Sequence, residues 1–438
     1  MLRQSLPLPV SESLLSVKEQ HAFHDKDQDC LFNEELPTVD RSMLTKIVQE
    51  NHYLYPMEKR DRPNNSIRVL VALHKMNATE EQLSIAYENT LQEVESIFIN
   101  NKNTRINERN WQDHLGNTSF YGDFLVFFDH QLNRLGLDEL LSRYFYSIPY
   151  SMGSQLQPFV QLAFGIEQEL PEIITQALAY YACTYMDVST IILPKEEAAA
   201  AMDSHTPTAA HPDRLDFVNT FLFDLVRSDQ RFDGRIDGDN TFQQSIKVLL
   251  KSKQELLQMY MAFWTKSTQA MSTEQKMDAL VYTAVCLVKY ASRPHLGHTE
   301  MDWFLTGGQL IESALALKKL ANSNESLLQA WVPLQFLAML CSFVVQGRPY
   351  FNPPQQEQHP LSTTALKMMM SHMDQHISHM MRHAHDDPKL VLALHSLMNV
   401  KTFYPHFAEE ALYVDIIQLL SSFSMDGGVW VKSGLGWK

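Results

Sequence analysis

The sequence predicts an all-α protein with a single large multi-helix core and two loop insertions. Glycine accounts for only 15 of the 438 residues, about half of its usual share of ~7%, and scarce glycine is unfavourable for a turn-rich all-β fold. Apolar residues recur at helical spacing, whereas no alternation of apolar and polar residues bounded by turns recurs. Hydrophobic residues make up 45% of the chain, which is enough to bury a core.

The N-terminal residues differ from the rest of the chain. Residues 1–60 are polar and contain several prolines, so we expect an N-terminal arm with short helices there. Residues 61–438 are expected to form one helical domain. Two segments interrupt its helical pattern, one near 195–214 that is rich in Ala, Thr and Pro, and one near 346–362 that is rich in Pro and Gln. The first predicts a surface excursion or a linker, and the second predicts a surface break between helices.

The helices can be followed along the chain by their caps. Thr79 and Gln82 have the spacing of a capping box, and an apolar stripe at helical spacing follows them. Residues 119–146 predict two helices that are separated at Gly136. Pro158 and Pro171 each suit the first turn of a helix. Further helices are expected from about 215 to 320 and over 363–383, 388–399 and 405–423.

Composition narrows the class of partner and the compartment. The chain has 36 Lys and Arg against 51 Asp and Glu, a net charge of −15, which argues against nucleic acid or an anionic membrane as a partner. No signal or transit peptide is expected, and we expect no stretch of about 18 uncharged apolar residues that would span a membrane. The four cysteines form no CxxC pair, and Cys183 and Cys286 are expected to be buried thiols. A reducing, cytoplasmic location is therefore expected.

The common catalytic signatures do not occur. The sequence has no GxSxG, which argues against a nucleophile elbow. It has neither GxxxxGK[ST] nor GxGxxG, so no phosphate-binding loop is expected, and it has no HExxH zinc motif.

One stretch, residues 368–385, is rich in histidine and methionine. His372, His376, His379 and His383 are spaced to share one face of a helix, where imidazoles can hold a divalent metal and the interleaved thioethers can add Cu(I) ligands. The alternative is that the methionines fill gaps in the core and the histidines form a solvated face. Under the first interpretation the protein binds or senses a metal through this helix.

Several motifs resemble the questin-oxidase-like family. The resemblance runs with gaps from about residue 60 to the C-terminus, and it is carried by residues 64–83, 111–128, 153–179 and 302–305. It implies a mostly helical oxygenase of fungal or bacterial secondary metabolism, acting on anthraquinones or related aromatic polyketides by Baeyer–Villiger-type oxygen insertion or ring cleavage. It also implies non-heme iron, held by several histidines and a carboxylated lysine, and NADPH as the electron donor.

In this sequence the histidine positions of the family hold other residues. They are Asn65, Arg68 and Val69 in the first motif, Gln157 and Gln161 in the second, and Gly307 in the third. Only the lysine position matches, as Lys389, which makes it the sole candidate catalytic residue. Amide oxygens are weak ligands, glycine supplies none, and Arg68 would place a positive charge beside the cation. The resemblance therefore implies non-heme iron and NADPH, but the residues at these positions support neither of them.

Two interpretations of the replaced positions remain open. In the first, Asn65, Arg68, Gln157, Gln161 and Gly307 line a polar pocket that hydrogen-bonds a quinone or a phenol. In the second, these residues form a buried polar network that only holds the helices together.

Two functions follow. The first is an oxidoreductase with oxygenase chemistry on an aromatic polyketide or anthraquinone. The alternative is a catalytically silent descendant of the family that binds a hydrophobic ligand or a partner protein. A small hydrophobic aromatic ligand is the expected partner.

Overall fold

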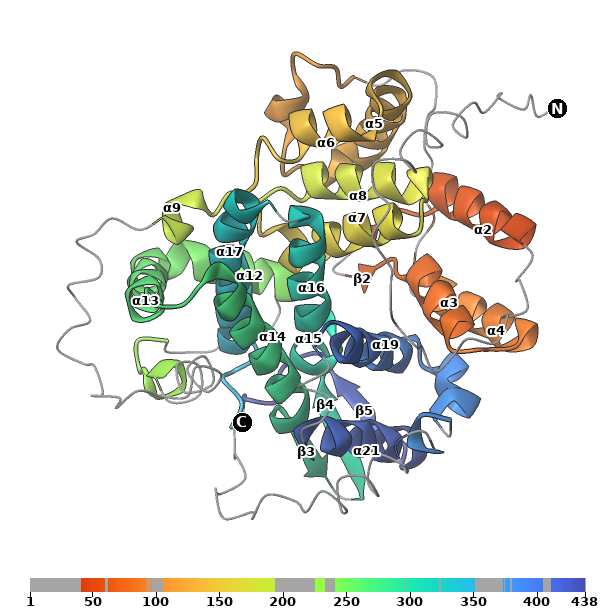
Figure 1. Cartoon of the computed structure of the whole chain (residues 1–438), viewed down its shortest axis with the longest axis vertical. Coiled ribbons are helices and arrows are strands. Elements are labelled where there is room, and N and C mark those ends of the chain that lie inside the picture. The colour runs from red at the N-terminus through yellow and green to blue at the C-terminus, as the bar shows by residue number, and fades with distance from the viewer. Residues whose placement is uncertain are drawn as a thin grey trace. The chain divides into compact units, whose positions relative to one another are not determined.

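The structure is a computed structural model. It describes residues 41–59, 62–92, 105–193, 225–232, 241–295, 297–322, 324–350, 380–404 and 411–437, with residues 94, 96, 373 and 375–378. Regular structure in these residues is almost entirely helical (Figure 1), which confirms the all-α prediction. The arm predicted over 1–60 is described only from residue 41. The segment near 195–214 and most of 346–362 lie outside the described residues.

The chain divides into two compact units. The first contains Met1–Met57, Glu95–Pro149 and Gln161–Tyr185, and the second contains Glu58–Val94, Tyr150–Val160 and Met186–Lys438. The helices of the first unit are α2 (Arg41–Leu54), η2 (Trp111–His114), η3 (Thr118–Phe120), α5 (Tyr121–Leu135), α6 (Leu137–Tyr144) and α8 (Pro171–Cys183). Helix α7 (Gln157–Glu167) begins in the second unit and continues in the first.

Aromatic side chains and one histidine hold the first unit together. Phe127 and Phe128 of α5 meet Tyr144 of α6 edge to face, at centroid distances of 5.3 and 5.7 Å. Gly136, with φ 75°, separates these two helices as predicted. The buried His52 of α2 lies 3.1 Å from the carboxylate of Asp129 through Nε2. Three helices are therefore tied together by packing and one buried imidazole.

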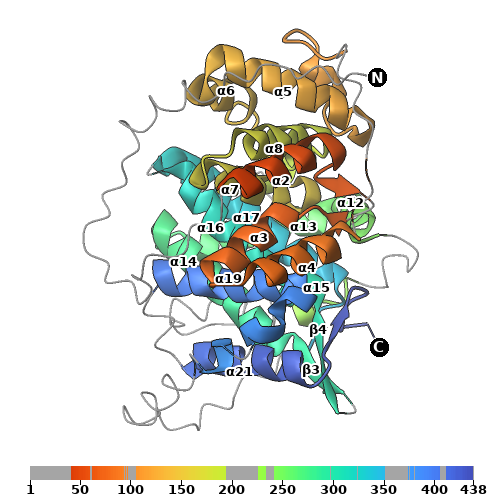
Figure 2. The same ribbon diagram turned by 90° about the vertical axis from the view of Figure 1, so that its right-hand side faces the viewer.

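The second unit holds most of the helices. They are α3 (Ser66–Lys75), α4 (Glu80–Leu91), η4 (Gly153–Leu156), α9 (Ser189–Ile192), α12 (Phe242–Ser252), α13 (Gln254–Ser267), α14 (Thr273–Tyr290), α15 (Trp303–Thr306), α16 (Gln309–Ala321), α17 (Glu325–Val345), η6 (Ala384–Asp386), α19 (Pro388–Phe403) and α21 (Ala411–Met425). Helices α14, α16 and α17 pack against one another, as Figure 1 shows. Helix α3 lies beside α19 (Figure 2).

Side-chain caps explain where several of these helices begin. The predicted capping box of Thr79 and Gln82 opens α4 and is confirmed. Capping boxes also open α12, from Thr241, and α14, from Ser272. Each box satisfies two backbone N–H groups, those of the N-cap residue and of the third helical residue, which have no partner within the helix. Loss of such a cap typically costs about 1 kcal/mol.

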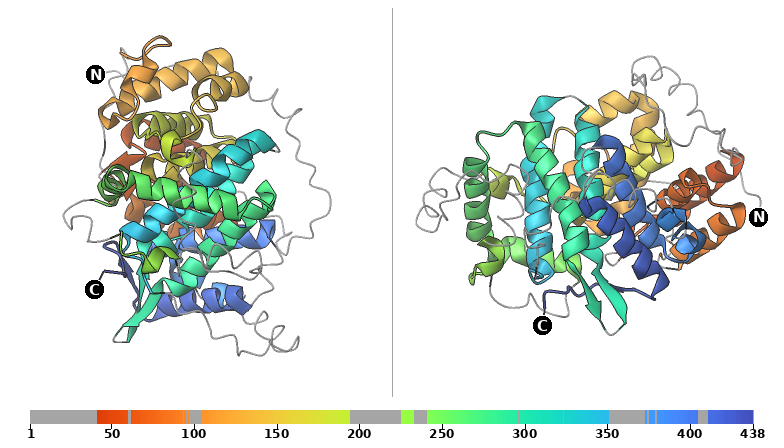
Figure 3. Two further views of the ribbon diagram at one scale, coloured as in Figure 1. Left: turned by 90° about the vertical axis from the view of Figure 1, so that its left-hand side faces the viewer. Right: turned by 60° about the horizontal axis from the view of Figure 1, so that its bottom comes forward.

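Short strands form two small sheets that the sequence did not predict. Strands β1 (Glu58–Lys59) and β2 (Arg62–Pro63) form an antiparallel pair. Strands β3 (Ser292–His295), β4 (His298–Asp302) and β5 (Val429–Val431) form a second sheet in that order, antiparallel between β3 and β4 and parallel between β4 and β5. The β3–β4 hairpin follows α14 directly (Figure 3). These strands are too short to produce a clear alternation of polar and apolar residues.

Within the described residues, one helix is long and apolar enough to cross a membrane. It is α17, which has a mean hydropathy of 1.7 over a window of 18 residues. Of that window, 83% is buried within the fold. The expectation that no such apolar stretch occurs is therefore wrong for this helix. Trp331 of α17 meets Phe159 edge to face at 5.6 Å, and Phe336 stacks on Trp264 at 4.6 Å. A helix covered on all sides is apolar around its whole circumference, which accounts for the composition of α17.

Candidate functional site

A buried guanidinium lies at the centre of a polar cluster in the second unit. Arg68 of α3, which is 6% exposed, forms an ion pair with Glu312 of α16, which is 9% exposed. The Nη1 atom of Arg68 donates hydrogen bonds to Asn65 Oδ1 at 3.0 Å and to Gln157 Oε1 at 3.5 Å. We name Asn65, Arg68, Gln157 and Glu312 the Arg68 cluster. Because an unpaired buried charge is strongly unfavourable, Glu312 is what allows Arg68 to lie inside the fold.

The ends of three helices bring this cluster together. Asn65 directly precedes α3, and Arg68 lies in the first turn of that helix, three residues later. Gln157 opens α7, and Glu312 lies in the first turn of α16. The positive end of a helix dipole favours an acidic side chain and disfavours a basic one. The carboxylate of Glu312 therefore interacts favourably with the dipole of α16. It also neutralises Arg68, whose positive charge is unfavourable at the start of α3.

A strained turn positions the start of α7. Ser154, Gln155 and Leu156 all have positive φ, at 46°, 52° and 64°, and all three are buried. Residues other than glycine seldom adopt this left-handed conformation, and runs of them are rarer still. Each strained residue costs on the order of 1–3 kcal/mol, and such strain is concentrated at functional sites.

Hydrogen bonds from two glutamines hold the turn in place. Gln155 Nε2 donates to Ser342 Oγ at 2.6 Å and to Ala338 O at 3.3 Å, both on α17. Gln309 Nε2, from the start of α16, donates to the backbone oxygen of Gln155 at 3.1 Å. The turn that leads into Gln157 is therefore fixed by both α16 and α17.

The structure brings together three of the predicted pocket residues. Asn65, Arg68 and Gln157 meet in the Arg68 cluster. Gln161 is buried one turn farther along α7 and belongs to the first unit. Gly307 does not join the cluster through any hydrogen bond or ion pair in the described residues.

Gly307 ends α15, and its position leaves no room for a side chain. Its backbone nitrogen donates to Trp303 O at 3.2 Å. A Cβ atom at Gly307 would lie 2.5 Å from that same oxygen, which is closer than real contacts allow. A ligand side chain at this position would therefore require the backbone of α15 to move.

Lys389 also contacts Trp303, through its side chain. The Nζ atom of Lys389 lies 4.6 Å from the centroid of the Trp303 ring, and that of Lys432 lies 5.9 Å from it. An aromatic face attracts the protonated ammonium, whereas a carboxylated lysine is an anion. The surroundings of Lys389 therefore favour the ordinary ammonium form. Asp387 caps the helix that carries Lys389 by accepting its backbone N–H at 3.0 Å.

The donor set does not fit histidine-bound iron. In the part of the chain that the structure describes, no three His, Cys, Asp or Glu side chains are grouped to hold a metal ion. The family positions that lie in the Arg68 cluster supply two amides, Asn65 and Gln157, and the guanidinium of Arg68. The carboxylate beside them, Glu312, is already paired with that guanidinium. A divalent cation there would face the positive charge of Arg68 at close range.

The histidine stripe is described only in part, and it remains a prediction. His376 Nδ1 lies 3.1 Å from Ser421 Oγ, and His383 is exposed. Met373 and Met380 are buried, as expected of methionines that fill the core. His372 and His379 lie outside the described residues.

Sequence reasoning missed Glu312, Gln155 and Asp302. Asp302 ends β4 and caps α15, accepting the backbone N–H groups of Phe304 and Leu305 at 3.0 and 3.1 Å. Burial raises the pKa of Asp302 to about 6, although hydrogen bonds from Gln346 and from the backbone oppose the shift.

The signal for Glu312 was an acidic residue inside the apolar run of 309–317. Gln155 gave no signal, since left-handed turns usually contain glycine.

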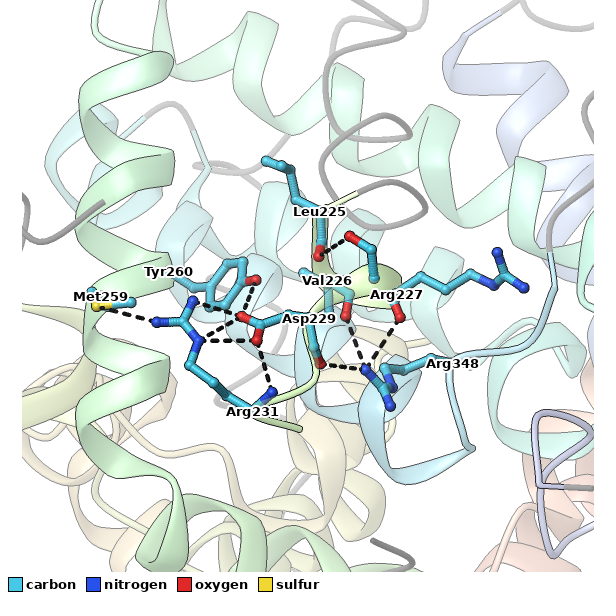
Figure 4. Close-up of polar contacts among 9 residues, drawn as sticks. Leu225, Val226, Arg227, Asp229, Arg231, Met259, Tyr260 and Arg348 are labelled. Atoms are coloured by element: carbon cyan, nitrogen blue, oxygen red, sulfur yellow. Dashed lines mark hydrogen bonds and ion pairs between the residues drawn. The ribbon is translucent and has the colours of Figure 1, made fainter. Parts of the chain in front are cut away.

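A second polar cluster, also in the second unit, fixes a short backbone segment (Figure 4). Arg348 Nη1 donates to three backbone oxygens, those of Val226, Arg227 and Asp229, at 3.3, 3.2 and 2.7 Å. The Asp229 carboxylate accepts from Arg231 and from Tyr260, whose hydroxyl lies 2.7 Å away. Burial opposes the ionisation of Asp229, but these hydrogen bonds hold its pKa below the ordinary value. The cluster anchors residues 225–232 to the rest of the unit.

Comparison with known proteins agrees with the resemblance of the motifs. The model of the family described as questin oxidase-like matches residues 63–389, a range that contains the Arg68 cluster and ends at Lys389. A Baeyer–Villiger oxidase from Pestalotiopsis microspora is 22% identical to this chain over 317 residues, which are 68% of this chain and 67% of that protein. Because the family match covers most of its length, the chain belongs to the questin oxidase-like family of oxidoreductases.

Proposed function

We propose that this protein inserts oxygen into an aromatic polyketide of secondary metabolism, without histidine-bound iron. Family membership and the relative named a Baeyer–Villiger oxidase support the reaction class. The proposal that no histidine-bound iron takes part is carried by the Arg68 cluster, in which a buried ion pair stands where the family has metal ligands. In such an insertion one atom of O₂ enters a C–C bond beside a carbonyl, and a two-electron reductant and two protons convert the other atom to water.

The Arg68 guanidinium suits the carbonyl oxygen of such a substrate. In the described residues its contacts occupy three of its five N–H donors. A remaining N–H directed at a carbonyl oxygen would stabilise the negative charge that develops as a nucleophile adds to the carbonyl carbon. Asn65, Gln157 and Glu312 would then be positioning residues that hold the guanidinium in place.

The alternative is a catalytically silent descendant of the family that binds the aromatic ligand or a partner protein. It is favoured by the pairing of Arg68 with Glu312, which already neutralises the charge of the guanidinium. The contact of Lys389 with Trp303 favours the silent descendant as well. Lys389 is the only residue that matches a family position, and its side chain packs on an indole ring.

We also place the protein in a reducing compartment such as the cytoplasm. Cys183, Cys286 and Cys341 are buried and form no disulfide bond among the described residues, which supports this placement.

Oxygen uptake by metal-depleted protein separates the two functions. We expect uptake with an anthraquinone-type ketone and a reduced nicotinamide, loss of uptake in Arg68→Met, and normal uptake in the surface control Arg143→Met. Ligand binding without uptake would support the silent descendant. Uptake that appears only after iron is added would contradict the iron-free proposal. The absence of both binding and uptake would contradict the oxidoreductase and leave only the silent descendant that binds a partner protein.

A further inference from the structure

A buried histidine joins the last turn of α2 to two other helices of the first unit. His52, whose side chain is 2% exposed, lies in that turn. Its Nε2 atom lies 3.1 Å from Asp129 Oδ2 on α5, and its Nδ1 atom lies 3.1 Å from the backbone oxygen of Glu172 on α8. One imidazole ring therefore fastens three helices, and Figure 2 shows α2 beside α8.

Both partners of the ring accept hydrogen bonds, and neither can donate one. A backbone carbonyl oxygen is only an acceptor, and so is an ionised carboxylate. A neutral imidazole has one N–H and one nitrogen lone pair, so it could donate to one partner and would face the other with a lone pair. Turning the ring over would bring carbon atoms to both positions. Both contacts are therefore satisfied only when the pair of His52 and Asp129 holds a second proton, which makes the ring an imidazolium.

The surroundings of the ring favour this cation. The last turn of a helix carries the negative end of its dipole, which stabilises a positive charge there. The charged groups that act at this end of α2 are the carboxylates of Asp129 on α5 and Glu172 on α8. Burial raises the pKa of the adjacent Tyr53, and these two charges raise it further. Burial also raises the pKa of Tyr121 on α5 well above its ordinary value. Both tyrosines therefore stay neutral, whereas histidine is the side-chain type that ordinarily changes charge between about pH 5 and 8.

We propose that the pair of His52 and Asp129 is a pH-sensitive latch, which holds α2 against α5 and α8 while it carries the second proton. Loss of that proton would leave a lone pair facing an acceptor, so that one of the two contacts is lost. Asp129 is 31% exposed, so the proton can reach solvent through its carboxylate. Because the docked helix binds a proton that the released helix gives up, docking is strongest at mildly acidic pH and weakens as the pH rises. The latch belongs to the first unit and does not depend on the proposed function.

Hydrogen exchange of residues 41–54 in the full-length protein tests the latch. The parent protein and Asp129→Asn are compared at each pH from about 6 to 8.5, so that the intrinsic pH dependence of exchange cancels. An asparagine amide can donate to a neutral Nε2 atom, so this variant should keep α2 docked without the second proton. Protection in the parent protein, relative to the variant, should fall at least about tenfold as the pH rises, because a buried hydrogen bond to a charged group is lost.

Asp123→Asn is the matched control. Asp123 also lies on α5, and it forms an ion pair with the exposed Arg105. This variant removes the same charge from the same helix without touching His52. Protection of α2 should therefore fall with pH in this control as it does in the parent protein.

The imidazole ring gives a second measurement in the parent protein. In protein labelled with nitrogen-15 histidine, nitrogen chemical shifts distinguish an imidazolium from a neutral ring. The His52 signal can be assigned through its contact with the Tyr53 ring, at a centroid distance of 4.7 Å. The second proton of the ring and the protection of α2 should be lost over the same pH range.

Each remaining outcome overturns the latch. Equal pH dependence of the parent protein and Asp129→Asn would show that the second proton does not hold α2. Loss of the pH dependence in Asp123→Asn would assign it to the general charge of α5. A ring that loses its proton while α2 stays protected would also contradict the proposal. Should Asp129→Asn not fold, this comparison of ring and helix in the parent protein still decides the question.

Discussion

The guanidinium of Arg68 and the carboxylate of Glu312 form a buried ion pair that joins α3 to α16. Arg68 stands at a position where the resemblance places a histidine ligand of iron. A cationic side chain and its counter-charge therefore hold together the helices that a metal centre would otherwise join. The chain belongs to an oxidoreductase family. Its candidate site is built around a buried ion pair, whereas the family resemblance implies a metal ion.

Breaking this ion pair from one side should destabilise the protein strongly. Arg68→Met or Glu312→Leu alone should lower the free energy of unfolding by about 3–5 kcal/mol, because each leaves a buried charge unpaired. The double variant should regain most of that loss. Urea unfolding of the four proteins measures the coupling. As a control, Arg143→Met removes an exposed pair with Glu139 and should cost less than about 1 kcal/mol. Single variants no worse than this control would show that the pair is not buried as described.

Relieving the left-handed turn should stabilise the fold. Ser154 has φ 46° and ψ 38°, a conformation that glycine adopts without steric cost. Ser154→Gly should therefore raise the free energy of unfolding by about 1 kcal/mol. Ser154→Ala keeps the strain and serves as the matched control. If glycine and alanine destabilise the protein equally in thermal unfolding, the turn is not strained.

Asp302 should make stability depend on pH. Its pKa rises in the folded state from the ordinary 3.8 to about 6, so folding favours the protonated form. The stability that Asp302 contributes is fully present below about pH 4 and is lost as the pH rises through 6. Relative to Asp302→Asn, the parent protein should lose up to about 3 kcal/mol between pH 4 and pH 7. Stability curves of the two proteins that stay parallel over this range would refute the shift.

Lys389 should act as an ammonium that packs on an indole. Lys389→Met should lower the free energy of unfolding by about 1 kcal/mol, and Lys389→Arg should preserve most of the contact with Trp303, because arginine also binds aromatic faces. Carbon-13 NMR in labelled bicarbonate should show no lysine carbamate. A carbamate resonance that disappears in Lys389→Arg would contradict this assignment.

Local chemistry made much of the fold predictable from the sequence. The capping box at Thr79, the break at Gly136 and the helix that starts at Pro171 appear where short-range rules place them. The sheet of β3, β4 and β5 was not predictable, because β5 pairs with β4 across a long stretch of chain and has only three residues.

The candidate site was predictable only in part. Asn65, Arg68 and Gln157 were singled out because they replace family ligands, and they do lie together. Glu312 was missed because only the packing of α3 against other helices brings it to Arg68. Gly307 and Lys389 meet at Trp303 instead of at Arg68, a relationship that the linear order of motifs does not contain.

The metal content of the protein tests most directly whether an ion pair has replaced the metal centre. Untagged protein is incubated with Fe²⁺ without oxygen, desalted and measured by inductively coupled plasma mass spectrometry. We predict substoichiometric iron in the parent protein and no change in its melting temperature on iron addition. Stoichiometric iron that is lost in Glu312→Leu would contradict the account, because it would make Glu312 a metal ligand rather than the partner of Arg68.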